Sequence, residues 1–143
     1  MEEKRLRRIL ELSRRLQGAR KGELSAARSE QLAALTLLEQ RKRDERTQLS
    51  ALEDAGDLSV YSLADQASRL QFAAAEVHKA RALHIETDAE VARREQASVE
   101  AARDVRKFEI LCERDGEQRR KAQKAAEQQT LDETRRAPRK GLS

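Results

Sequence analysis

Apolar residues recur every three or four positions along the first part of the chain, which is the spacing of a stripe along one face of a helix. The stripe runs through Leu6, Ile9, Leu10, Leu16, Leu24, Ala27, Leu35, Leu38, Leu49 and Leu52. It predicts a first helix over about residues 2–53. Gly18 and Gly22 weaken this helix by about 1 kcal/mol each relative to alanine, but no proline interrupts it.

A short linker, residues 54–59, breaks the pattern. Its Gly56 can adopt the left-handed conformation that ends many helices. Ser62 and Asp65 fit a capping box at the start of a second helix. The candidate N-caps of that helix are Asp57, Ser59 and Ser62. Because the linker is short, the second helix is expected to fold back beside the first.

A second stripe predicts a helix over about residues 60–136, followed by a tail over 137–143 in which Pro138 ends the helix. The steps alternate between three and four residues, as a heptad seam requires. The stripe runs through Leu63, Ala67, Leu70, Ala74, Val77, Arg81, His84, Asp88, Val91, Glu95, Ser98, Ala102, Val105 and Cys112. Its charged and polar middle predicts a weakly packed seam there.

The two helices together predict an all-α fold, an elongated antiparallel two-helix coiled coil whose second helix overhangs the first. Facing positions have numbers that add up to about 115, so Gln31 should face His84 and Leu6 should lie near Phe108. In this register Met1 lies near Arg114, and the residues from 114 onward project as a lone helix. The predicted core consists of Leu10, Leu24, Leu38, Leu52, Leu63, Val77, Val91 and Val105. The same seam can also form between two chains, which leaves monomer and dimer open.

The composition favours this interpretation over a globular fold. Of the 143 residues, 39% are charged and only 2% are aromatic, which is typical of long helices and coiled coils. Disorder is the competing interpretation, but a net charge of only +4 and regularly spaced leucines favour helices. A single cysteine, Cys112, excludes an intramolecular disulfide. Apolar runs are too short to span a bilayer, so a soluble cytoplasmic protein is expected.

Charge is segregated along the chain. Residues 1–21 hold 8 basic and 3 acidic groups, residues 114–143 hold 9 and 5, and residues 22–113 hold 13 and 18. A hairpin brings the two basic ends together. The first turn carries several cations, where the helix dipole disfavours them, and this unfavourable placement indicates a binding role. An acidic protein surface suits such an end. Nucleic acid suits it less, because the chain has no aromatic platform and no leucine-zipper layout.

Nothing in the sequence predicts catalysis. His78 and His84 are six residues apart, which is wrong for two metal ligands on one helix face, and Cys112 has no histidine near it in this register. No glycine-rich phosphate loop or metal-ligand spacing is present. A two-helix rod offers no enclosed pocket. A non-enzyme without cofactor or metal is therefore expected.

Two C-terminal segments carry a family resemblance. The stretch Arg103-Asp104-Val105-Arg106-Lys107-Phe108-Glu109-Ile110-Leu111-Cys112-Glu113-Arg114 resembles a basic, hydrophobic, Glu-x-Leu, acidic-Arg segment of the flagellar FliJ family. The run from Arg119-Arg120-Lys121 to Leu131-Asp132-Glu133 is similar to that family's basic run and hydrophobic-Asp-Glu signature. Chain length and the break near residue 56 also fit. The YscO-type stalks of injectisomes share this architecture, so the secretion system stays open.

The resemblance implies a non-enzymatic central stalk of a flagellar or other type III protein export apparatus, peripheral to the cytoplasmic face of the inner membrane. The paired basic termini would enter the hexameric export ATPase, and the opposite part would reach the membrane protein of the export gate. Export chaperones are further implied partners. The implied ATPase-binding residues are Arg5, Arg8, Arg15, Arg114, Arg119, Arg120, Lys121, Lys124, Leu131, Asp132 and Glu133. The implied gate-binding residues are Tyr61, Leu70 and Val77.

The region near the start of the second helix departs from the family, which often has more aromatics than the Tyr61 and Phe72 found here. The alternative function is a basic coiled-coil adaptor or scaffold that binds nucleic acid, an anionic membrane or another coiled coil. Binding to nucleic acid should fall steeply with salt, which separates it from the stalk.

Overall fold

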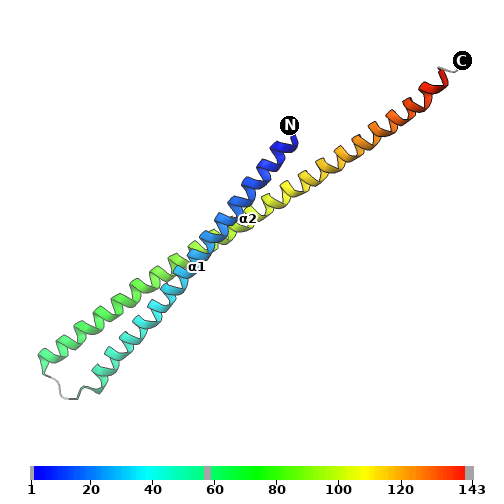
Figure 1. Cartoon of the computed structure of the whole chain (residues 1–143). Coiled ribbons are helices and arrows are strands. Elements are labelled where there is room, and N and C mark those ends of the chain that lie inside the picture. The colour runs from blue at the N-terminus through cyan, green and yellow to red at the C-terminus, as the bar shows by residue number, and fades with distance from the viewer. Residues whose placement is uncertain (1, 57–58, 141–143) are drawn as a thin grey trace. The chain divides into compact units, whose positions relative to one another are not determined.

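The chain folds into two long helices. The structure, a computed structural model, describes residues 2–56 and 59–140, with side chains as far as residue 136. Helix α1 spans Glu2–Asp54 and helix α2 spans Val60–Lys140 (Figure 1). The described residues contain no strand, and the predicted all-α two-helix hairpin is confirmed. Neither helix, over these residues, contains a stretch long and apolar enough to cross a bilayer.

The helix ends lie close to the predicted bounds, with one difference. Helix α1 ends at Asp54, one residue beyond the prediction, and α2 begins at Val60 as predicted. However, α2 continues to Lys140, so Pro138 does not end it. A proline removes a single backbone donor, and a helix can lose one hydrogen bond near its end without stopping.

Ser59 is the N-cap of α2. Its side-chain oxygen accepts a hydrogen bond from the backbone N–H of Ser62 at 3.3 Å, and its carbonyl accepts one from the N–H of Leu63 at 3.0 Å. Of the candidate N-caps, the structure therefore uses Ser59 and not Ser62, so the capping box predicted for Ser62 and Asp65 does not start the helix. The candidate cap Asp57 lies outside the described residues.

Helix α1 does not end with the left-handed glycine that the sequence suggested. Among the described residues no glycine has a positive φ, and Gly56 is included in this statement. The break after Asp54 therefore does not use the glycine-based cap expected there.

The hairpin consists of two compact units, and each unit contains part of both helices. Residues Gly18–Val99 form one, here called the turn unit, and residues 2–17 with 100–140 belong to the other, here called the terminal unit. In each unit the helices are antiparallel, because the partner on α2 moves back along the chain as α1 moves forward. The ion pairs are Glu23–Arg94 and Arg41–Glu76 in the turn unit, and Glu3–Arg119 and Arg14–Glu109 in the terminal unit.

The seam of the turn unit is narrow. Leu38 of α1 packs with Val77 and Ala80 of α2, and Leu37 lies against this cluster. The buried residues of the unit are Ala27, Ala34, Leu38, Ala73, Val77, Ala80 and Val91. Among the described residues no side chain is less than 2% exposed, so the seam is thin as well as rich in alanine.

The predicted stripe on α2 is wrong at every second position. Leu70, Val77, Val91 and Val105 lie on the seam, but between them the structure buries or half-buries residues one place earlier than predicted. The seam contains Ala73, Ala80, Thr87, Arg94 and Ala101, and not Ala74, Arg81, Asp88, Glu95 and Ala102, which are exposed. In this register the charged residues Arg81, Asp88 and Glu95 stay outside the seam, and of the five seam residues just listed only Arg94 is charged. Burying a charged side chain costs free energy, which favours the observed register over the predicted one.

Several leucines assigned to the stripes are also exposed. Leu63 is 52% exposed, so its assignment to the core is wrong. On α1, Leu16, Leu35 and Leu49 are exposed beside the seam. Leu10, Leu24 and Leu52 are half-buried on it.

Polar side chains interrupt the seam of the turn unit. Gln31 donates a hydrogen bond to Asp88 at 2.7 Å, and His84 Nε2 lies 3.6 Å from the same carboxylate oxygen. The sequence placed His84 opposite Gln31, so the observed partner lies one helical turn further along α2. Nearby, the seam residue Arg94 donates to Glu23 across the helices at 3.0 Å and to Glu90 on its own helix at 2.7 Å.

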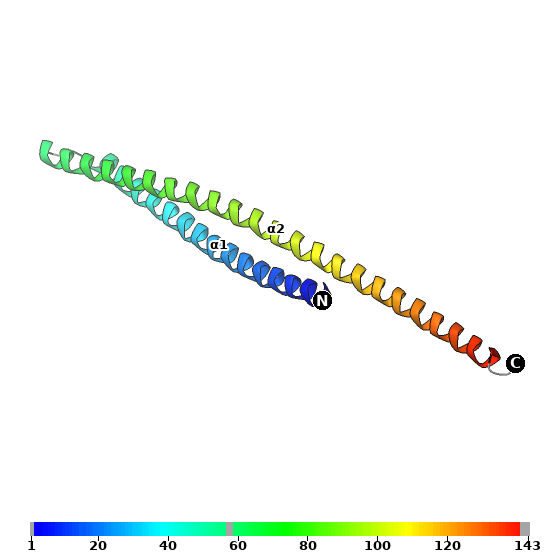
Figure 2. The same ribbon diagram turned by 90° about the horizontal axis from the view of Figure 1, so that it is seen from above.

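In the terminal unit, Ala101 and Val105 are buried, and Leu6, Leu10 and Phe108 are half-buried. Pairing continues to Glu3 of α1 and Arg119 of α2, which form an ion pair. The lone part of α2 therefore begins beyond Arg119 and not at residue 114. Figures 1 and 2 both show α2 continuing past the start of α1.

Candidate functional site

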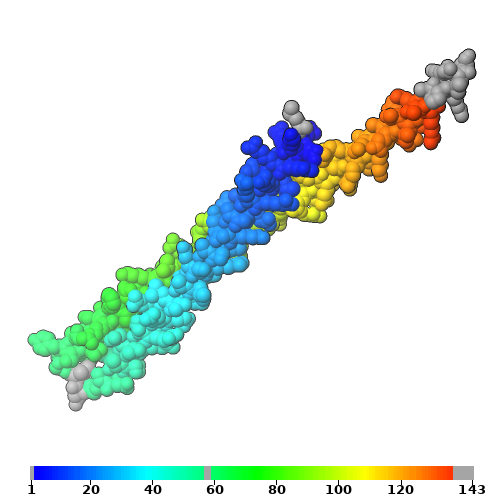
Figure 3. Space-filling model, viewed as in Figure 1, coloured from blue at the N-terminus to red at the C-terminus, as the bar shows by residue number. Residues whose placement is uncertain are grey.

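The paired helix ends in the terminal unit are held by charged side chains. Glu3 of α1 contacts Arg119 of α2, and its other oxygen lies 2.8 Å from Arg7 Nη2. Arg119 also lies 3.1 Å from Asp115 through its Nε. A second cross-helix pair, Arg14 Nη2 to Glu109 Oε1 at 3.6 Å, lies further along the unit. The contact of Glu3 with Arg119 thus holds the start of α1 against α2 beyond the apolar seam. Figure 3 shows the start of α1 lying against α2.

The Glu3–Arg119 contact changes the acidity of both groups. The hydrogen bond from Arg119 is the main cause that lowers the pKa of Glu3 below its ordinary value of 4.5. The same hydrogen bond raises the pKa of Arg119. Both groups are in contact with water, so the pair is expected to be sensitive to salt and weak in stabilisation.

Of the eight candidate cations predicted from the sequence, six are exposed and have no ion pair with any residue that the structure describes. They are Arg5, Arg8, Arg114, Arg120, Lys121 and Lys124. Two other candidates from the sequence differ: Arg119 is engaged by Glu3 and Asp115, and Arg15 pairs with Glu11 at 2.8 Å. The whole unit contains 18 basic and 12 acidic residues, a net charge of +6, whereas the turn unit contains 12 and 14, a net charge of −2.

A groove of about 490 Å³ lies at the paired ends, between Leu6 and Arg7 of α1 and Cys112 and Arg120 of α2. Cys112 is half-buried, with a free thiol. The groove is lined mainly by charged side chains, so it suits a polar partner surface more than an apolar ligand.

Beyond the paired ends, α2 is exposed over its whole circumference. Every residue from 117 to 136 is exposed, and the helix is supported by contacts along itself, such as Gln128 to Asp132 at 3.4 Å. Leu131 is 54% exposed, next to Asp132 and Glu133. The structure thus leaves these three candidates open to a partner.

The candidate gate-binding residues, in the turn unit, do not form one surface. Tyr61 is 89% exposed and Leu70 is half-buried. Val77 is 6% exposed and packs on Leu38, so its proposed contact with a gate protein is wrong. The candidates predicted from the sequence did not include Val60, which is 81% exposed beside Tyr61.

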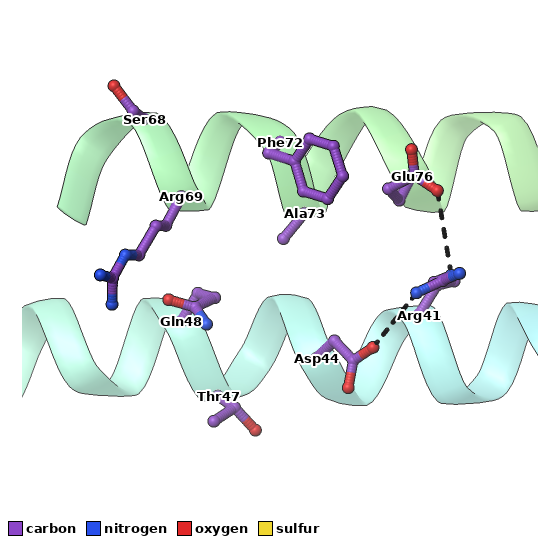
Figure 4. Close-up of a pocket in the computed structure, with 9 residues that line it drawn as sticks. All are labelled: Arg41, Asp44, Thr47, Gln48, Ser68, Arg69, Phe72, Ala73 and Glu76. Atoms are coloured by element: carbon purple, nitrogen blue, oxygen red, sulfur yellow. Dashed lines mark ion pairs between the residues drawn. The ribbon is translucent and has the colours of Figure 1, made fainter. Parts of the chain in front are cut away.

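A groove of about 450 Å³ lies nearby between the helices of the turn unit. Phe72, 67% exposed, stands on its α2 side (Figure 4). From α1, Arg41 reaches Asp44 at 3.7 Å and Glu76 of α2 at 4.0 Å. The groove combines one aromatic side with charged side chains of both signs, which is a surface suited to a protein partner.

The described side chains include no group of three or more His, Cys, Asp or Glu placed to hold a metal ion. His78 is exposed, and His84 contacts Asp88. No family model, curated protein or solved structure matches the chain.

Sequence reasoning missed Glu3, which fixes the start of α1, because only apolar positions were followed. The heptad spacing could have shown that Glu3 and Arg119 lie on the seam. Glu3 lies seven residues before Leu10, and Arg119 lies seven residues after Cys112, so both continue the seam of their helix.

Proposed function

We propose that this protein is the central stalk of a flagellar or related type III export apparatus, which it joins to the hexameric export ATPase through the terminal unit. The observation that carries this proposal is the set of six candidate cations of the terminal unit that are exposed and without ion pairs among the described residues. They lie where the start of α1 meets α2 and where α2 continues alone. A slender helical end with free positive charge suits insertion into an acidic protein ring.

The proposal also draws on the resemblance of residues 103–133 to the FliJ family. The turn unit would then face the export gate through Tyr61, Val60 and Phe72, which are strongly exposed. As a stalk, the protein would work at the cytoplasmic face of the inner membrane without catalysing a reaction itself.

The test measures ATP hydrolysis by the export ATPase of the same organism with and without this protein. The key variant reverses Arg120, Lys121 and Lys124 to Glu, and it leaves the Glu3–Arg119 pair intact. The matched control reverses Lys42, Arg43 and Arg46 of the turn unit to Glu, which changes the net charge equally.

We expect the intact protein and the control to stimulate hydrolysis and to co-migrate with the ATPase, and the key variant to do neither. If the intact protein neither stimulates nor binds, the stalk proposal fails. If both charge reversals weaken binding equally, the contact is not located on the terminal unit. Binding to DNA that falls steeply with salt would instead support the adaptor function.

A further inference from the structure

At the end nearest the linker, the seam of the turn unit buries a polar side chain instead of an apolar one. Gln66 of α2 is half-buried there, and its side-chain carbonyl oxygen is buried without a hydrogen-bond partner among the described residues. If the amide were turned over, its NH2 group would occupy the same dry position. Leu63, three residues nearer the linker, is 52% exposed, and Leu49 of α1 is 43% exposed. The observed seam thus buries a polar atom and leaves two leucines in water, and both placements are unfavourable.

A second seam on this part of α2 would remove both costs. The observed seam consists here of Gln66, Leu70, Ala73 and Val77. The second seam consists of Leu63, Ala67, Leu70, Ala74 and Val77. Successive residues lie about 100° apart around a helix, so the centres of the two seams differ by about 50°. A rotation of α2 by this angle would turn Gln66 to water and bring Leu63 and Ala67 toward α1.

Charge confines this freedom to the residues nearest the linker. Further along α2, the second seam would place Arg81, Asp88 and Glu95 against α1, which their burial disfavours. Before residue 80, no position at which the two seams differ is charged. A run of three alanines, residues 73–75, lies between the two stretches. One alanine of this run can replace its neighbour on the seam without a change of size, so a small change of winding there lets the preceding residues rotate alone.

We propose that residues 60–72 of α2, here called the tip segment, switch between the observed seam and the second seam by turning about 50° around the helix axis. Beyond the alanines, the packing of Leu38 with Val77 and Ala80 holds α2, so the rest of the turn unit keeps the observed seam. The switch lies wholly within the turn unit and is independent of the stalk function proposed above.

The rotation changes the groove between the helices of the turn unit. Arg69 extends from α2 toward α1 beside Gln48, and Phe72 stands on the same side of α2 (Figure 4). Arg69 and Phe72 both lie on the side of the tip segment that turns away from α1 in the second seam, so the groove opens there. A protein that binds in the groove against Phe72 therefore favours the observed seam, and its release lets the tip segment turn. Binding in the groove is thereby coupled to which residues the tip segment presents to solvent.

Ala67→Leu tests for the second seam, because Ala67 is exposed in the observed one. In the second seam a leucine at residue 67 packs on α1, so we expect at least threefold slower hydrogen exchange at the backbone amides of residues 47–54. The matched control, Ala64→Leu, makes the same change at an exposed alanine that lies outside both seams, and it should leave this exchange unchanged. Equal exchange in the two variants would overturn the proposal.

Disulfide formation in a Cys112→Ser background reports on both seams directly. Because Arg41 pairs with Glu76 and the helices are antiparallel, Leu52 lies opposite about residues 65–66. Leu52→Cys combined with Gln66→Cys reports the observed seam, and Leu52→Cys combined with Ala67→Cys reports the second. We expect both pairs to cross-link, and Ala67→Leu to slow the first pair at least threefold. A first pair that forms while the second does not, or that Ala67→Leu leaves unchanged, would contradict the switch.

The matched control pairs lie beyond the alanines, where charge fixes the seam. Leu38→Cys with Ala80→Cys should cross-link, because these two residues pack together. Leu38→Cys with Arg81→Cys should not, because Arg81 is exposed outside the observed seam. If this last pair cross-links as fast as the pair at residues 52 and 67, the hairpin opens along its whole turn unit, and a switch confined to the tip segment is refuted.

Discussion

Two neighbouring alanines of α2 give the sharpest test of how the helices pair. Ala101 is 5% exposed on the seam of the terminal unit, whereas Ala102 is exposed. The apolar pattern of the sequence places Ala102 on the seam instead. Replacing each alanine in turn by aspartate adds the same carboxylate one residue apart. Only one of the two carboxylates should then meet the opposite helix.

The expected magnitudes follow from the surroundings. An unpaired carboxylate at residue 101 loses water, which costs several kcal/mol in real proteins, and Asp104 one turn away adds repulsion. Because the seam is thin, the helices can relieve this by separating locally, so we expect about 2–4 kcal/mol. At residue 102 the change lowers helix propensity by about 0.5 kcal/mol, and Arg106 four residues on recovers part of it.

Hydrogen exchange of the backbone amides of residues 2–17, read by mass spectrometry, reports this local separation. A loss of 2 kcal/mol corresponds to about 30-fold faster exchange for Ala101→Asp. Ala102→Asp should change exchange by less than about threefold. Faster exchange in Ala102→Asp than in Ala101→Asp would show that the seam has the register of the sequence pattern and that the pairing described above is wrong.

Three further results are expected. Gly116→Ala should stabilise α2 by about 1 kcal/mol, because a Cβ there meets nothing, and a urea midpoint that falls would contradict this. Arg119 lowers the pKa of Glu3, so their contact stabilises the terminal unit fully above pH 4.5 and is lost as the pH falls through the lowered pKa. Glu3→Gln should abolish this pH dependence of hydrogen exchange. An exchange–pH profile that Glu3→Gln leaves unaltered would refute the pairing. Ser59→Ala should cost about 1 kcal/mol at the start of α2 and expose the Ser62 amide to exchange, whereas Ser62→Ala keeps that amide bonded and should cost less.

The sequence predicted the two helices and their antiparallel pairing, because both depend on local signals. Stripes of apolar residues mark each helix, and the short linker near Gly56 forces the fold-back. It did not predict which neighbour enters the seam, since alanines occupy both alternatives. These pairs are Ala73 with Ala74 and Ala101 with Ala102. Hydrophobicity cannot decide between two neighbouring alanines. Only the charged residues at the other seam positions of α2 favour the observed register over the predicted one.

The cations of the candidate site could be predicted from the sequence, but the ion pairs that some of them form could not. The sequence identified the basic ends, and the exposed Arg120 and Lys121 agree with that expectation. It did not show that Arg119 is engaged by Glu3, because an ion pair at the end of a seam leaves no apolar signal. Which cations remain free for a partner depends on such contacts, and that information comes only from the three-dimensional arrangement.

The thin seam has a consequence for function. Alanine brings the helices close but buries little apolar area, and among the described residues no side chain lies below 2% exposure. Such a hairpin draws modest stability from its own core, and any partner that binds the folded form will add to it by mass action. The stalk proposed above, held in a protein ring, would gain contacts of this kind. The exposed candidate cations of the terminal unit are therefore the surface through which binding should stabilise this chain.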